Sequence, residues 1–231
     1  LDTSLTFITG VAETAIFPVS SGDTLEIVFT SGATESDNIA LLGTMQKYAD
    51  RGNHLITCVT EHKAILDTAK HLESLGKKVT YLPVNELGEI DLKELEDSIT
   101  DETVMISIMI ANNEIGTIQD AKAIGEIAHR HDVIFHTDAA QAVGHIPVNV
   151  EEMSIDLMSF SAHKMYGPKG IGALYVRGVK PRVKPDGLFY GGGQERNIRS
   201  GTLNVPGIVG FGKAVEISQK EMDAENQRFS E

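Results

Sequence analysis

The chain has 231 residues, and its 41% of hydrophobic and 23% of charged residues are ordinary for a soluble globular protein. Its formal net charge of −13 disfavours nucleic acid and anionic membrane surfaces, so we expect neither as a partner. The single cysteine, Cys58, excludes an internal disulfide and a site in which several cysteines bind a metal, so we expect no metal site and, by default, a reducing, cytoplasmic location.

From residue 25 onward, short β-rich runs alternate with amphipathic helical patterns. In chain order, the pattern predicts a strand at 26–29, a helix at 34–48, a strand at 55–59, a helix at 64–75, a strand at 79–82, a helix at 92–99, a strand at 104–110, a helix at 121–131, strands at 133–136, 157–160 and 173–176, and a helix from 205 onward. This alternation predicts an α/β fold with a mostly parallel sheet sandwiched by helices.

We expect one large domain over residues 25–231 and leave residues 1–24 unassigned, because the first residues do not fit the alternating pattern. The run 176–193 contains five Gly and two Pro and is predicted to be a loop. Ligands of such sheets collect beyond the carboxyl ends of the strands, so polar segments that follow a predicted strand are candidate site residues.

A turn of small residues, 30–35, follows the first predicted strand. Small residues let the backbone approach a ligand closely, and the N–H groups at a helix start attract an anion. The hydroxyl of Thr34 can add a hydrogen bond. An ordinary helix cap explains the same turn, and taken alone the turn favours that interpretation.

Asp138 follows the strand predicted at 133–136. A partly buried Asp needs a cation or hydrogen-bond donors to stay ionised, and a protonated pyridine nitrogen is such a partner. Taken alone, a helix cap is an equally good interpretation.

Lys164 lies just after the strand predicted at 157–160, in a glycine-rich segment. We expect it to be poorly solvated, so that its amine can lose its proton and bond covalently to an aldehyde. Ser161 and His163 flank it and can hold a phosphate. The alternative, a solvated loop lysine, is the usual state of Lys, but the apolar strand beside it argues against simple exposure.

His62 follows the strand predicted at 55–59, where an imidazole can stack on an aromatic ring, although an isolated His is more often structural.

The combination of segments decides the interpretation. Asp138 precedes Lys164 by 26 positions with one strand between them, so an acid, an amine and a phosphate-binding turn share one edge of the sheet. Pyridoxal 5'-phosphate (PLP) needs these three groups, and the sequence therefore predicts a PLP site.

Six motifs, taken in order, resemble those of the cysteine desulfurases, which are NifS/IscS-like members of the class V aminotransferase group with the fold type I PLP architecture. They are TSGATE (30–35), EHK (61–63), NNEIG (112–116), HTDAAQ (136–141), SAHK (161–164) and GGGQER (191–196). The resemblance covers 25–231. It implies a homodimer that converts L-cysteine to L-alanine and passes the sulfur to acceptor or scaffold proteins, for iron–sulfur clusters and tRNA thiolation.

The resemblance also implies roles for residues around the cofactor ring. Lys164 holds the cofactor covalently, and Asp138 pairs with the ring nitrogen. His62 stacks on the ring and moves protons. Gln141 bonds the ring hydroxyl oxygen, and Asn113 lies near it and near the substrate.

At the other end of the cofactor, the resemblance implies that the phosphate is held by the backbone of Ala33 and by Thr34, Ser161 and His163. It implies that Thr202 reaches the phosphate of the neighbouring subunit. A plain glycine-rich loop is the alternative interpretation of the segment that contains Thr202.

In this family, the cysteine that attacks the substrate sulfur and the arginine that binds the substrate carboxylate lie further along the chain, in a small domain. We expect that domain to be absent from the 231 residues and the chain to be incomplete for turnover. Cys58 lies in an apolar run and is expected to be a core residue. The alternatives are another class V PLP enzyme, such as a selenocysteine lyase or an aminotransferase, and a non-catalytic interaction module with the same fold.

Overall fold

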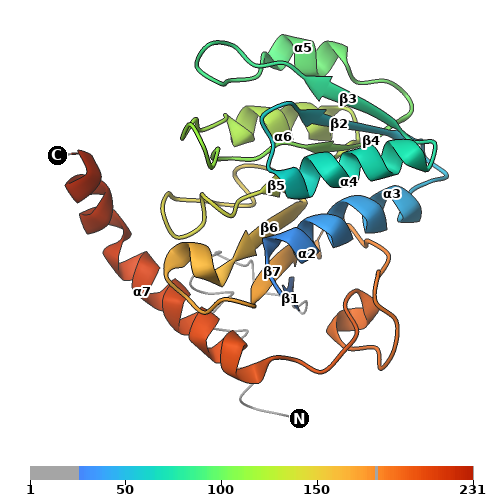
Figure 1. Ribbon diagram of the computed structural model, residues 1–231. Coiled ribbons are helices and arrows are strands. Elements are labelled where there is room, and N and C mark those ends of the chain that lie inside the picture. Colours follow the sequence, from blue (N-terminus) through green and yellow to red (C-terminus); the bar gives the residue numbers. More distant parts are fainter. Residues whose placement is uncertain (1–25, 180–181, 231) are drawn as a thin grey trace.

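The computed structural model describes residues 26–179 and 182–230, which form one seven-stranded sheet with helices on both faces (Figure 1). The unassigned segment 1–24 lies outside these residues. The strand order is β1-β7-β6-β5-β4-β2-β3. The strands are β1 (Ile27–Thr30), β2 (His54–Cys58), β3 (Lys78–Leu82), β4 (Thr103–Ser107), β5 (Ile134–Asp138), β6 (Leu157–Ser161) and β7 (Gly172–Val176).

The helices alternate with the strands up to β5, as the sequence predicts. They are α2 (Ala33–Asn38), the π-helical segment η1 (Ile39–Gly43), α3 (Thr44–Lys47), α4 (Lys63–Ser74), α5 (Leu92–Asp97), α6 (Ala121–Arg130), the 3-10 turns η2 (Ala162–Met165) and η3 (Glu195–Asn197), and α7 (Val205–Ser230).

One strand, β7, runs antiparallel to both of its neighbours, β1 and β6. The other four pairings are parallel. The prediction of a mostly parallel sheet between helices is therefore confirmed. Because β7 is reversed, β1 points the same way as β6, and the start of β7 lies at the edge where the other six strands end.

Each face of the sheet is buried in its own hydrophobic core. On one face, Ile124 of α6, Phe211 of α7 and Phe135 of β5 belong to one core. On the other face, Ile65 of α4 belongs to a second core together with Ile134, the residue before Phe135 on the same strand. Successive side chains of a strand point to opposite faces, so burial of both faces explains the apolar runs of the central strands.

The helix predicted at 34–48 is continuous but is not a uniform α-helix, because η1 interrupts it. Gly43 ends the π-helical segment beneath the loop after β7. A Cβ at this position would overlap the carbonyl oxygen of Asp186, and the Asp186 N–H donates to the Gly43 carbonyl at 3.0 Å. The glycine permits this close approach, and no pattern of apolar residues could have indicated it.

The strand predicted at 104–110 ends earlier, at Ser107. Beyond it, the N–H of Met109 donates to the side-chain oxygen Oε1 of Glu61 at 2.6 Å instead of pairing with a strand backbone. The prediction of a longer strand was wrong because a buried side chain takes over this backbone bond.

Val176, the first residue of the loop predicted at 176–193, is the last residue of β7, and the other described residues of this run form no helix or strand, which confirms the loop prediction for them. The predicted C-terminal helix is α7, which crosses one side of the molecule (Figure 1). None of the helices in the described ranges combines the length and the apolar character needed to cross a membrane.

Asp37 lies on the buried side of α2, facing β6, and is completely buried. Its Oδ1 atom lies 3.7 Å from Nε2 of His136, which is also completely buried. The ring nitrogens of His136 bond the hydroxyls of Ser107 (2.8 Å) and Ser159 (3.0 Å). Burial lowers the pKa of His136 to about 3. Burial, and then the charge of Asp138, raise the pKa of Asp37 well above its ordinary value, so Asp37 keeps its proton to a higher pH in the folded chain than in the unfolded one.

Replacing Asp37 by Asn should therefore stabilise the protein more at pH 7 than at pH 4. Because its pKa is raised in the folded state, Asp37 holds its proton to a higher pH there than in the unfolded chain, where it ionises as the pH rises through about 3.8. The wild type thus loses stability relative to the Asn variant as the pH rises. Denaturant unfolding at several pH values measures this difference.

The exposed Asp50→Asn variant is the matched control and should show no such widening. A difference between Asp37→Asn and wild type that narrows with rising pH would mean that Asp37 is stabilised as an anion, contrary to this account.

Candidate cofactor-binding site

A cavity of about 620 Å³ opens at the edge of the sheet where β1, β5 and β6 end. Nine of the ten predicted site residues line it, and Thr202 does not. The lining residues are Ser31, Gly32, Ala33, Thr34, Glu35, His62, Met109, Asn113, Asp138, Ala140, Gln141, Ser161, His163, Lys164, Lys169 and Gly170.

Asp138 is the last residue of β5 and is only 3% exposed. Its Oδ1 atom accepts a hydrogen bond from the N–H of Ala140 at 2.9 Å. Burial raises its pKa, and this bond and the nearby charges of His62 and Lys164 offset the rise only in part. Within the described ranges, no cationic side chain hydrogen-bonds this carboxyl, so it is a buried acid that a cation would stabilise.

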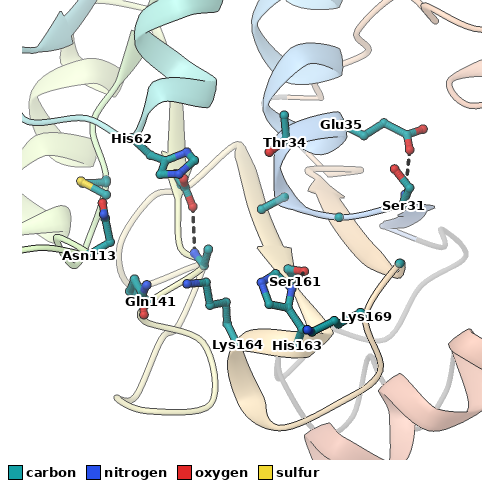
Figure 2. Close-up of a pocket in the computed structure, with 16 residues that line it drawn as sticks. Ser31, Thr34, Glu35, His62, Asn113, Gln141, Ser161, His163, Lys164 and Lys169 are labelled. Carbon is teal, nitrogen blue, oxygen red and sulfur yellow. Dashed lines mark hydrogen bonds between the residues drawn. The ribbon is translucent and has the colours of Figure 1, made fainter.

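Lys164 lies on the 3-10 turn η2, directly after β6, and its side chain lines the cavity (Figure 2). The backbone here is held by a hydrogen bond from Nε2 of His145 to the Lys164 carbonyl (2.7 Å), and the turn ends at Tyr166 with a left-handed φ of 62°. The prediction that Lys164 is poorly solvated was wrong. The residue is exposed, because the turn carries it clear of the buried strand.

Ser161 and His163 form one corner of the cavity beside this lysine. Ser161 ends β6, and its hydroxyl bonds Nδ1 of His163 at 2.7 Å. Burial, and then the charges of Lys164 and Lys169, lower the pKa of His163. Two lysines and two side chains that can donate hydrogen bonds thus surround one corner, which suits an anion.

The turn that opens α2 faces the same corner with Gly32, Ala33 and Thr34. Gly172, at the start of β7, brings this turn close to β6. A Cβ at Gly172 would lie 2.6 Å from the Cα of Gly32, so a side chain there would push the turn away. The reversed strand therefore helps to place the backbone of the turn beside Ser161.

His62, Asn113 and Gln141 lie on the opposite side of the cavity (Figure 2). His62 is the N-cap of α4, and its Nδ1 accepts a hydrogen bond from the N–H of Ala64 at 3.1 Å. When the ring is neutral, this bond places its proton on Nε2. The helix-cap role and a role in the site are thus compatible for the same histidine.

Several lining residues were missed by sequence reasoning. Lys169 reaches the cavity because β7 is reversed, which the strand pattern did not reveal. Glu35 belongs to the TSGATE motif, but the motif was interpreted through its backbone and its threonine. Thr202 is exposed and lies outside the cavity, and its contact with a neighbouring subunit stays a prediction.

The groups around the cavity fit PLP. Lys164 offers an amine, the buried Asp138 accepts no hydrogen bond from a cationic side chain of the described residues, and the corner at Ser161 and His163 suits a phosphate. Within the described residues, no cluster of three or more His, Cys, Asp or Glu side chains could hold a metal ion.

The family model described as aminotransferase class-V matches residues 13–231. The chain is 56% identical over 220 residues to the cysteine desulfurase IscS of Histophilus somni (strain 2336), and 53% identical over 219 residues to that of Escherichia coli O139:H28 (strain E24377A / ETEC). Each alignment covers 95% of this chain and 54% of the relative, so the chain spans about half the length of these curated relatives.

Solved structures show the same relationship. A protein described as NifS-like matches with a TM-score of 0.89 and 41% identity, over 96% of this chain and 60% of its own. A structure described as SspA in complex with cysteine matches with a TM-score of 0.84 and 44% identity, over 93% and 61%. The sequence match and the fold agree, and the chain belongs to the class-V aminotransferase family.

Proposed function

We propose that the intact protein is a cytoplasmic, PLP-dependent cysteine desulfurase that converts L-cysteine to L-alanine, and that residues 25–231 are its PLP-binding large domain. The main support for this function is one cavity that brings together the amine of Lys164, the buried carboxyl of Asp138 and the corner at Ser161 that suits a phosphate. The choice of substrate is supported by the relatives, which are named cysteine desulfurases, and by the solved neighbour that is described as a complex with cysteine.

The chemistry that PLP supplies when bound is the withdrawal of electrons from the substrate carbon next to the amino group. Lys164 would hold the cofactor's aldehyde carbon through its amine. Asp138 would keep the ring nitrogen protonated. A cation at this point would also remove the cost of burying the Asp138 carboxylate alone, because a paired buried charge is more stable than an isolated one.

The phosphate end would be held by the backbone of Ala33 and the side chains of Thr34, Ser161 and His163. These groups come from the ends of two strands that share one edge, so their spacing is set by the sheet. Donors that are fixed before the ligand arrives bind it with little loss of conformational entropy.

His62 would stack on the ring and move a proton during the reaction. Its hydrogen bond from Ala64 fixes the ring orientation and leaves Nε2 as the nitrogen that exchanges a proton with a ligand. Gln141 would bond the ring hydroxyl, and Asn113 would lie near the substrate.

The thiol that takes the sulfur is not Cys58. This residue ends β2, is 1% exposed, and lies with Sγ 2.9 Å from Oγ1 of Thr60. Burial, and then the charge of Glu61, raise the pKa of the thiol, whereas attack on sulfur needs an accessible thiolate. The nucleophile would therefore lie elsewhere in the intact protein.

The intact protein would act as a homodimer in which Thr202 reaches the phosphate bound in the neighbouring subunit. It would pass the sulfur to acceptor or scaffold proteins.

Replacing Asp138 by Ala in the intact protein should weaken PLP binding and reduce alanine formation from L-cysteine. Loss of a charge-assisted hydrogen bond costs about 1.5–3 kcal/mol, or roughly ten- to a hundredfold in Kd. Fluorescence titration with PLP and an alanine assay measure the two effects. The exposed Asp101→Ala variant should behave as wild type, and wild-type PLP affinity in Asp138→Ala would refute the pairing.

Replacing Cys58 by Ala should leave sulfide and alanine formation by the intact protein unchanged, apart from any effect of the small cavity on stability. A sulfide assay at saturating L-cysteine, with circular dichroism to confirm folding, tests this. A well-folded Cys58→Ala variant that makes no sulfide would identify Cys58 as the nucleophile and overturn this assignment.

A further inference from the structure

Two distant segments meet at the side chain of Glu35. Its Oε2 atom accepts a hydrogen bond from the N–H of Ser31 at 2.7 Å (Figure 2), and its Oε1 atom accepts one from Nε of Arg199 at 2.8 Å. The side chain of Glu35 is 10% exposed and that of Arg199 is 23% exposed. The Glu35 carboxylate thus joins the turn beside the cavity corner at Ser161 and His163 to a segment that carries Arg199, 164 residues further along the chain.

The segment that carries Arg199 has a defined position. The N–H of Phe29 on β1 donates to Oε2 of Glu195 at 2.8 Å. Three consecutive non-glycine residues, Glu195, Arg196 and Asn197, have left-handed φ values of 46°, 59° and 65°. Such backbone is costly for residues with a Cβ and persists only where contacts enforce it. Arg199, which binds Glu35, therefore lies on a segment whose backbone position is fixed by contacts.

The charge of Glu35 matters because this residue also lines the cavity. Burial acts to raise its pKa, but the hydrogen bonds from Ser31 and Arg199 outweigh burial and hold the pKa below its ordinary value. Glu35 is consequently an anion at neutral pH. An uncompensated anion here would repel a phosphate in the same cavity, and the guanidinium of Arg199 offsets that repulsion.

We propose that Glu35 and Arg199 are a positioning pair for the phosphate-binding turn. Glu35 holds the turn through the Ser31 N–H, and Arg199 both fixes the Glu35 carboxylate and neutralises it. The inference rests on the proposed function, because it assumes a ligand that carries a phosphate. It assigns the pair no contact with the reacting atoms.

The test compares PLP with pyridoxal, which lacks the phosphate, on intact wild-type protein and on Glu35→Gln, Arg199→Ala and the double variant. Arg199→Ala removes the cation that compensates the Glu35 carboxylate, so the Kd for PLP should rise about tenfold. Glu35→Gln should raise it less, and the double variant should recover part of the Arg199→Ala loss, because the charge that needed compensation is gone. The Kd for pyridoxal should be the same in all four proteins.

Lys213→Ala, which breaks an exposed ion pair with Glu216 on α7, is the matched control and should bind both compounds as wild type does. Losses for pyridoxal that equal those for PLP would show general damage and overturn the inference. Additive losses in the double variant, or unchanged PLP affinity in Arg199→Ala, would overturn it as well. A wild-type protein that binds no PLP would instead refute the proposed function, and the role of the pair with it.

Discussion

A carboxyl group at the buried end of a central strand must either stay neutral or meet a cation, and Asp138 is held in this situation by the fold. Strand β5 is flanked by β4 and β6 and covered on both faces, so its last residue cannot turn toward bulk water. The cavity above it is the direction from which a cationic partner can come. The site thus depends on an electrostatic requirement that the sheet itself creates.

The direction of β7 decides which other groups surround that carboxyl. Its reversal keeps β1 parallel to the central strands and brings the start of β7 to their carboxyl edge. The turn before α2, the turn η2 that carries Lys164, and Lys169 therefore face one cavity. With seven parallel strands, the start of β7 and Lys169 would lie at the opposite edge of the sheet.

Much of this arrangement could be predicted from the sequence because the central strands are buried on both faces, which leaves long apolar runs between polar segments. The order of Asp138 and Lys164 around β6 was enough to place an acid and an amine on one edge. The π-helical segment at Gly43, the early end of β4 at Ser107 and the solvation of Lys164 could not be predicted. Each depends on a contact between distant segments or on the path of a turn, and neither leaves a periodic pattern in the sequence.

The site as proposed requires that Lys164 hold the aldehyde of PLP, and chemical trapping can identify the lysine that does so. Borohydride reduction of the intact protein with bound PLP should fix the cofactor to one lysine, and proteolysis with mass spectrometry identifies the peptide. The expected result is a single labelled peptide that contains Lys164. Label on a peptide that contains Lys169 but not Lys164, or no label on a protein that binds PLP, would mean that Lys164 does not hold the cofactor.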